Sequence, residues 1–118
     1  MVDDEEPIRE ILRDYLDLLD CDAAEAGSAT EARALLERDP FDLVFTDFAM
    51  PGEDGLQVAE ITRRVQPTVP VVILSGFATD AMAMHRIRQR GFAFVTKPVG
   101  FDAFRSVVER ALGGQIGR

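Results

Sequence analysis

Apolar residues recur along the chain with two different spacings. Between residues 7 and 19 they stand three or four positions apart, as on the buried face of a helix. Between residues 71 and 74 they form an unbroken, largely β-branched run, which is typical of a parallel strand buried on both faces. Similar patterns, bounded by Pro, Gly and Asp, divide the rest of the chain. The predicted helices are 7–19, 28–38, 56–65, 80–89 and 102–112, and the predicted strands are 21–26, 41–46, 71–74 and 92–96.

The alternation of helices and strands predicts an α/β fold. A helix between successive strands indicates βαβ units, and hence a parallel sheet covered by helices on both faces. No linker, repeat or low-complexity stretch divides residues 1–118, so we expect a single domain. Only Met1 and Val2 precede Asp3, which predicts a shortened first strand. Either the start is truncated or the centre of the sheet is poorly filled.

Composition removes several classes of function. The 47% of hydrophobic residues supports a packed core. The single cysteine, Cys21, excludes an intrachain disulfide and a cysteine-ligated zinc or iron–sulfur site. No apolar run is long enough for a membrane span, and the N-terminal segment is acidic, so we expect a cytoplasmic protein without a secretory signal. The net charge of −8 argues against direct binding to nucleic acid.

Polar side chains stand where the predicted strands end, and ligands of such sheets bind at the carboxyl ends of the strands. One of them is the only lysine among the 13 basic residues. The residues at these strand ends, which we expect to lie together, are Asp3, Asp4, Asp47, Ser75 and Lys97.

This set favours phosphoryl chemistry around a metal ion. Three clustered carboxylates repel one another unless a cation lies among them, and oxygen ligands without His or Cys favour Mg²⁺. A lysine and a hydroxyl opposite the metal would hold phosphoryl oxygens. Asp47 is the best candidate for a nucleophile that forms an acyl phosphate, because it ends a central strand and opens a loop. Taken singly, Asp3 and Asp4 favour a helix-capping acidic cluster and Asp47 could as well be a turn residue, but their shared location at strand ends favours the functional interpretation.

Four short motifs occur in a specific order and spacing along the chain. They are Val2-Asp3-Asp4-Glu5 followed by Ile8-Arg9, then Thr46–Leu56, Val72–Gly76 and Thr96-Lys97-Pro98. Together they resemble the receiver domain of response regulators in two-component (histidine–aspartate phosphorelay) signalling, over essentially the whole chain. The resemblance implies a flavodoxin-like (βα)5 three-layer sandwich with a parallel sheet of order 2-1-3-4-5.

The resemblance also implies a role for each acidic residue. Asp47 would be the phosphoacceptor. Asp4, Asp47 and the backbone carbonyl of Ala49 would be Mg²⁺ ligands, and Asp3 would act through water. A histidine kinase or phosphotransfer protein would donate the phosphoryl group, so the domain would be a signalling switch and not an enzyme acting on other molecules.

A conformational switch is the further implication of the family. Lys97 would contact the phosphoryl group, Ser75 would bond it after transfer, and the Lys97-Pro98 peptide would be cis. Phe94 would then turn inward, signalling by packing because it lacks a hydroxyl; a permanently buried Phe94 is the alternative. The face formed by the fourth helix, fifth strand and fifth helix would shift and meet a downstream protein. We expect a monomer or weak dimer.

Three rival interpretations remain. A metal-dependent phosphatase with an aspartate nucleophile usually has a second acid two residues on, where this chain has Ala49. A flavin-binding electron carrier needs a hydroxyl- and glycine-rich phosphate loop, and the acidic residues 3–6 would repel a flavin phosphate. A pseudo-receiver that binds partners without phosphorylation is the main alternative.

Overall fold

A computed structural model describes residues 1–50, 53–76 and 81–113 of the chain. The predicted helices form within about two residues of their expected bounds, although Asp80, the predicted start of one, lies outside the described residues. The elements are α1 (Glu6–Leu18), α2 (Ala29–Arg38), β1 (Val44–Asp47), β2 (Ala49–Met50), β3 (Glu53–Asp54), α3 (Gly55–Val65), β4 (Val71–Ser75), α4 (Ala81–Gln89), β5 (Ala93–Thr96) and α5 (Phe101–Ala111).

Three strands form a parallel sheet in the order β1-β4-β5. The register pairs Asp47 of β1 with Leu74 of β4, and Ser75 of β4 with Thr96 of β5. Because the strands run in the same direction, their carboxyl ends meet at one edge of the sheet. The register therefore brings the predicted strand-end residues Asp47, Ser75 and Lys97, which follows Thr96, to the same edge of the sheet.

The segment before α1 joins the sheet through single bridges. Val2 forms parallel bridges with Ala26 and Thr46, so it lies between Ala26 and β1. The predicted strand over 21–26 does not form as a strand, since Ala26 makes the bridge and its small neighbours provide little cross-strand packing. The expected order of five strands is thus found in part: three strands are paired, and single bridges mark the other two positions.

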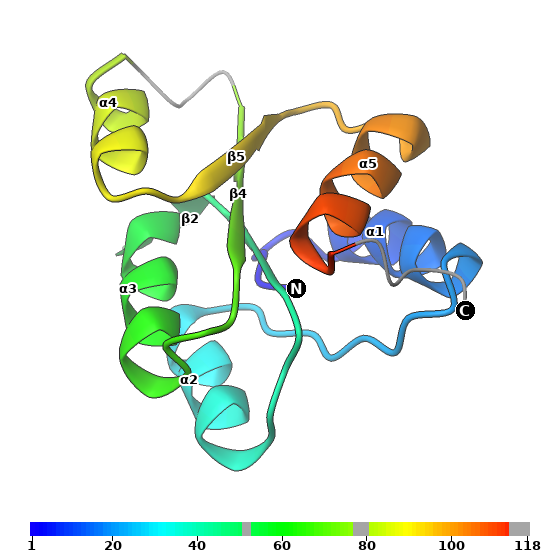
Figure 1. Cartoon of the computed structure of the whole chain (residues 1–118), viewed down its shortest axis with the longest axis horizontal. Coiled ribbons are helices and arrows are strands. Elements are labelled where there is room, and N and C mark those ends of the chain that lie inside the picture. Colours follow the sequence, from blue (N-terminus) through cyan, green and yellow to red (C-terminus); the bar gives the residue numbers. More distant parts are fainter. Residues whose placement is uncertain (51–52, 77–80, 114–118) are drawn as a thin grey trace.

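Helices cover both faces of the sheet (Figure 1), with α1 and α5 on one side and α2, α3 and α4 on the other. Alternate residues of β4 point to opposite faces, as in any strand. Val72 and Leu74 pack in the cluster that includes Phe104 of α5, whereas Val71 and Ile73 pack in the cluster beneath α2 and α3. The continuous apolar run of the sequence is explained by this burial on both faces.

The loop between the predicted strand 41–46 and the predicted helix 56–65 contains a short antiparallel hairpin, in which Ala49 pairs with Asp54. Two of the loop's residues, Pro51 and Gly52, lie outside the described part of the chain. Asp54 caps α3 in a capping box with Gln57. Gly55 begins the helix so close to β1 that a Cβ atom built on it would lie 2.5 Å from the carbonyl oxygen of Asp47.

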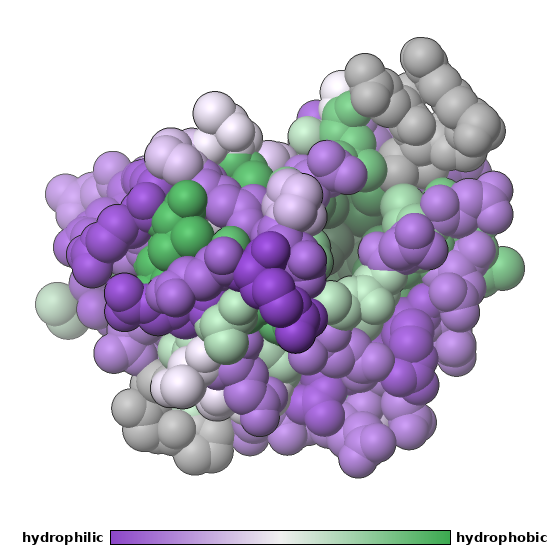
Figure 2. Space-filling model, turned by 90° about the horizontal axis from the view of Figure 1, so that it is seen from below, coloured by the Kyte–Doolittle hydropathy of each residue, from purple (hydrophilic) through white to green (hydrophobic). Residues whose placement is uncertain are grey.

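The surface of the described residues shows only scattered apolar side chains. The face drawn in Figure 2 is mostly hydrophilic, with small separate apolar areas. The large apolar side chains that are exposed, Ile11, Leu18 and Met82, belong to two different helices. Within the described ranges, no helix has both the length and the apolar character needed to cross a membrane.

Candidate functional site

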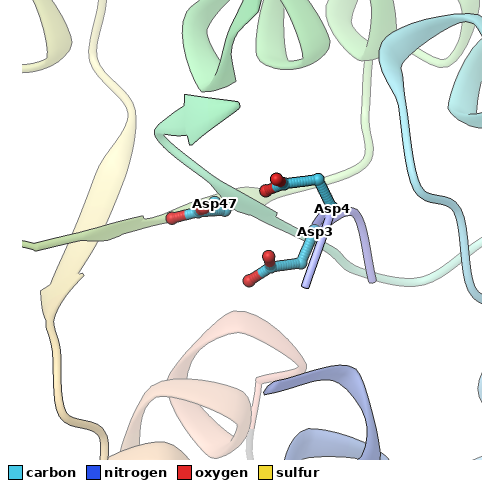
Figure 3. A group of neighbouring side chains, drawn as sticks. All are labelled: Asp3, Asp4 and Asp47. Atoms are coloured by element: carbon cyan, nitrogen blue, oxygen red, sulfur yellow. The ribbon is translucent and has the colours of Figure 1, made fainter. Parts of the chain in front are cut away.

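Three carboxylates gather at the carboxyl edge of the sheet. Figure 3 shows Asp3 and Asp4, from the segment before α1, beside Asp47 at the end of β1. One carboxylate oxygen of each residue lies within 4.8 Å of the other two. Asp3 and Asp47 are buried, with 1% and 5% of their surface exposed, whereas Asp4 is exposed. The sequence-based prediction that these acids meet is confirmed.

Backbone hydrogen bonds hold the acidic segments together. The N–H of Val2 donates to the carbonyl of Phe45 at 2.8 Å, and the N–H of Asp47 donates back to the carbonyl of Val2 at 2.8 Å. On the other side, the N–H of Asp3 donates to the carbonyl of Ala26 at 3.0 Å. Residues far apart along the chain are therefore locked into one pocket by the sheet pairing itself.

Lys97 reaches into this pocket from the segment after β5. Its Nζ atom lies 2.7 Å from Oδ1 of Asp47 and 3.6 Å from Oδ2 of Asp3. Burial alone would lower the pKa of Lys97, but the hydrogen bond and charge of Asp47, with the charge of Asp3, outweigh it and raise that pKa. The lysine therefore stays cationic over the physiological range.

The two buried acids carry an electrostatic strain. Burial is the main cause that raises the pKa of Asp3 and that of Asp47 above 3.8; the hydrogen bond and charge of Lys97 oppose it at Asp47. Oδ1 of Asp3 accepts a hydrogen bond from the N–H of Glu5 at 2.9 Å, but buried Oδ2 has no hydrogen-bond partner within the described residues. A buried carboxylate oxygen lacking a hydrogen bond is costly.

A divalent cation would relieve both features. The donor set consists of carboxylate oxygens only, which matches a hard ion such as Mg²⁺. Oδ2 of Asp3 offers a buried oxygen to such an ion or to one of its waters, and exposed Asp4 leaves a side open to solvent. The residues present therefore fit Mg²⁺.

The remaining predicted residues lie around the acidic pocket. Ser75 ends β4, is 4% exposed, and its hydroxyl donates to the carbonyl of Val95 at 3.5 Å. The N–H of Lys97 donates to the carbonyl of Ser75 at 2.7 Å, so the two residues lie side by side across the sheet. Ala49 lies two residues beyond Asp47 and is exposed. The Lys97-Pro98 peptide is cis, as expected.

Phe94 lies in β5 and is only partly buried. The guanidinium carbon of Arg88, in the last turn of α4, is 5.2 Å from the centre of its ring. The ring is thus neither wholly enclosed in the core nor free, so the alternative of a fully buried Phe94 does not describe this structure.

Sequence reasoning gave no role to Gly55 or to Arg9. Gly55 lies in the motif Thr46–Leu56, and the structure shows that it allows α3 to start against the backbone of Asp47. A glycine directly before the predicted helix 56–65 was the available signal. Arg9 contacts the carbonyl of Asp3, and no spacing pattern indicates such a contact.

The chain is similar to known signalling proteins over most of its length. The family model "Response regulator receiver domain" matches residues 1–109. Response regulator protein PilR of Pseudomonas aeruginosa is 36% identical over 112 residues, which are 95% of this chain and 25% of PilR. The C4-dicarboxylate transport transcriptional regulatory protein DctD of Rhizobium meliloti is 30% identical over 94% of this chain and 24% of its own length. The chain therefore spans about a quarter of these curated relatives.

Solved structures show the same fold. The receiver domain of NtrX from Brucella abortus has a TM-score of 0.85 and 32% identity, covering 95% of each chain. A CheY-like receiver domain protein from Methanospirillum hungatei has a TM-score of 0.88 and 23% identity, over 97% of this chain and 91% of its own. At the lower identity, the likeness concerns the fold only.

Proposed function

Since the chain belongs to the response regulator receiver domain family, a signalling module of two-component systems rather than a catalytic enzyme, we propose that it is a switch that accepts a phosphoryl group on Asp47. The observation that carries this proposal is the contact of Asp47 with Lys97 inside a pocket that also holds Asp3 and Asp4. A buried strand-end carboxylate with a cation on one side and a metal-ligand set on the other has what aspartyl phosphorylation requires.

The donor is a phosphohistidine on a histidine kinase or phosphotransfer protein. A carboxylate oxygen of Asp47 forms the new O–P bond. The P–N bond breaks, and its electron pair leaves with the imidazole nitrogen, so that an acyl phosphate remains on Asp47. Lys97 lies 2.7 Å from Asp47 Oδ1, close enough to follow the transferred group and neutralise one of its oxygens.

Asp4, Asp47 and the backbone carbonyl of Ala49 would hold Mg²⁺ directly, and Asp3 would hold it through water. A bound ion of this kind neutralises phosphoryl oxygens and helps to align the group for transfer. The buried oxygen of Asp3 that lacks a hydrogen bond supports this assignment, because a water of the ion's shell would give it one.

Signalling follows from a shift in population between two packings of the β4–β5 edge. Phosphorylation adds negative charge and acceptor oxygens beside Ser75, which lies one residue from the pairing partner of Asp47. Ser75 exchanges its long bond to the Val95 carbonyl for the phosphoryl group, and Phe94 fills the space behind it. The face of α4, β5 and α5 changes shape and binds a downstream protein.

We also infer that the full sheet has the order 2-1-3-4-5. In this order the segment around Val2 is strand 1, the segment around Ala26 is strand 2, and β1, β4 and β5 are strands 3, 4 and 5. The bridges of Val2 to Ala26 and to Thr46 support it, since they put the first two segments on the correct side of β1. The alternative function, a pseudo-receiver that binds partners without phosphate, shares this fold but not the need for Asp47.

Intact-mass analysis after incubation with acetyl phosphate and Mg²⁺ tests the proposal. The wild-type chain should gain one phosphoryl group and Asp47→Asn none. Asp42→Asn, at an exposed aspartate near the start of β1, is the matched control and should behave as wild type. A wild-type chain that gains no phosphate with either acetyl phosphate or a phosphorylated histidine donor would support the pseudo-receiver instead.

A further inference from the structure

Arg9 turns back from the start of α1 toward the segment that precedes the helix. Its Nη1 donates a hydrogen bond to the carbonyl oxygen of Asp3. Its Nε lies 3.4 Å from Oε1 of Glu25, on the segment that flanks Val2 in the sheet. With 18% of its side chain exposed, Arg9 is a largely buried cation that donates to a backbone carbonyl and forms an ion pair with a carboxylate, while its buried Nε makes no hydrogen bond within the described residues. Buried charges of this kind need such partners.

The carbonyl that Arg9 contacts belongs to the peptide unit between two proposed metal-site residues. Because a peptide unit is planar, the direction of this carbonyl sets ψ of Asp3 and φ of Asp4 together. Together with the side-chain torsions, those two angles set where both carboxylates lie relative to Asp47. The N–H of Asp3 is already held by Ala26 at 3.0 Å, so the bond from Arg9 fixes the other side of Asp3.

We propose that Arg9 is a positioning residue for the metal pocket: by holding the Asp3 carbonyl while anchored to Glu25, it fixes the peptide that joins Asp3 to Asp4. This inference rests on the proposed function, in which the two acids serve Mg²⁺. Arg9 acts through the backbone, because its hydrogen bond goes to the Asp3 carbonyl and its ion pair to Glu25, and neither contact is to a carboxylate of the pocket. A guanidinium can make both contacts at once, whereas the single ammonium of lysine is poorly shaped for two partners in different directions.

Gly27 lies beside the Arg9 head. A Cβ atom built at Gly27 would lie 3.3 Å from Nη1 of Arg9, closer than an ordinary contact. The N–H of Gly27 donates to Oε2 of Glu31 at 2.7 Å, which holds this part of the backbone in place. The guanidinium therefore has a fitted site and not merely a solvent-facing position.

Arg13 provides a matched contrast one turn further along α1. It pairs with the same carboxylate, since its Nη1 lies 2.6 Å from Oε2 of Glu25, and 43% of its side chain is exposed. In the described part of the chain, its hydrogen bond goes to Glu25 and not to the Asp3–Asp4 peptide. A variant at Arg13 thus perturbs the ion pair but leaves the carbonyl contact.

Titration of the purified chain with Mg²⁺ alone tests the inference. Calorimetry measures the Kd for Mg²⁺, and circular dichroism measures the melting temperature of each variant. Arg9→Met should raise the Kd for Mg²⁺ about tenfold, the usual loss when an outer partner of a metal ligand is removed. Arg9→Lys should show most of this loss. The Kd of Arg13→Met should stay within about twofold of wild type, because an exposed ion pair contributes little free energy.

A second readout separates positioning from general stability. In acetyl phosphate reactions, Arg9→Met should raise the Mg²⁺ concentration for half-maximal rate by the same factor as the Kd, while the rate at saturating Mg²⁺ stays within about threefold of wild type. A purely structural role would lower the melting temperature and leave the half-maximal concentration unchanged.

The outcomes distinguish a failure of the inference about Arg9 from a failure of the proposed function. Equal Kd values for Arg9→Met and wild type, equal losses in Arg9→Met and Arg13→Met, or full affinity in Arg9→Lys would each overturn the inference. If Arg9→Met fails to fold, the comparison of Arg9→Lys with Arg13→Lys decides it in the same way. A wild-type chain that binds no Mg²⁺ overturns the proposed function and the inference with it, whereas a binding wild type with an unaffected Arg9→Met overturns the inference only.

Discussion

The Nζ atom of Lys97 lies 2.7 Å from Oδ1 of Asp47, joining the segment after β5 to the end of β1. The strands β4 and β5 lie between these two residues in the chain. The sheet register brings the two residues together through Ser75, whose carbonyl accepts a hydrogen bond from the N–H of Lys97. The contact has two consequences that oppose each other. In the proposed function it holds the carboxylate in place for phosphoryl transfer, and its positive charge competes with any metal ion for the same carboxylate.

Replacing Lys97 should separate these consequences. Lys97→Met removes the competing charge, so we expect Mg²⁺ to bind at least as tightly as in wild type. The phosphorylation rate with acetyl phosphate should fall about 10- to 100-fold, because a fixed cation that neutralises the transferred group is lost. Calorimetry and initial rates by intact mass measure the two effects. Weaker Mg²⁺ binding in Lys97→Met would contradict this assignment of charges.

The buried acid Asp3 should make the metal-free chain less stable as the pH rises. Burial raises its pKa in the folded state above 3.8, so the folded chain binds a proton more tightly than the unfolded chain. The resulting stabilisation is present at low pH and is lost as the pH rises through the folded pKa. In EDTA at pH 7, Asp3→Asn should therefore raise the free energy of unfolding by about 1 kcal/mol, since the amide can donate to a neighbouring carboxylate.

When Mg²⁺ is in excess, Asp3→Asn should be less stable than wild type, the reverse of the order expected in EDTA. Binding to the folded state stabilises the wild type by mass action, and Asp3→Asn forfeits part of that gain. Urea unfolding with EDTA and with Mg²⁺, at pH 5 and pH 7, measures all four conditions. A variant less stable than wild type in EDTA at pH 7 would show that Asp3 is not under electrostatic strain.

Gly55→Ala should damage both the fold and the site. The new Cβ would meet the carbonyl oxygen of Asp47 at 2.5 Å and the Cα of Phe48 at 2.9 Å, and these backbone atoms cannot move aside as a flexible side chain would. We expect a loss of about 2–3 kcal/mol in unfolding free energy, near the upper range for overpacking, and slower phosphorylation. Urea unfolding and intact mass measure these.

Gly100→Ala is the control for Gly55→Ala. A Cβ at Gly100 meets no atom of the described residues within 4 Å, and its position as N-cap of α5 limits the expected loss to about 1 kcal/mol or less. If the two substitutions cost the same, the close approach of α3 to Asp47 is not what Gly55 provides.

Phe94→Trp should report on the proposed switch. The chain contains no tryptophan, so the new indole would be its only one. If the ring turns from the side of Arg88 into the core on phosphorylation, the emission should shift to shorter wavelength after acetyl phosphate and Mg²⁺ are added. The double variant with Asp47→Asn should show no shift. An emission wavelength that does not change on phosphorylation would show that Phe94 has no role in the switch.

The sequence supported the elements and the acidic pocket because both depend on local rules. The apolar run at Val71–Leu74 could only be a strand buried on both faces, and the alternation of elements required a parallel sheet. Once the strands were parallel, Asp47 and Lys97 had to end at the same edge. Their meeting was therefore predictable without knowing any side-chain contact.

Features that depend on packing between distant segments were beyond the sequence. The prediction of a strand over 21–26 was wrong because pairing needs a neighbour along the whole segment, and here only its end, at Ala24 and Ala26, bonds to residues 1–3. The contact of Arg9 with the Asp3 carbonyl and the close approach at Gly55 each join two segments at atomic distance. No periodicity in the residues of either segment encodes such distances.

The pocket draws on the third residue of the chain and on the ninety-seventh, with Lys97 placed 3.6 Å from Asp3. During translation, the early carboxylates leave the ribosome long before the lysine that neutralises them does. A nascent polypeptide holds the complete pocket only when its synthesis has passed α4 and β5. A polypeptide that stops short of β5 therefore lacks the cation that faces Asp3 and Asp47.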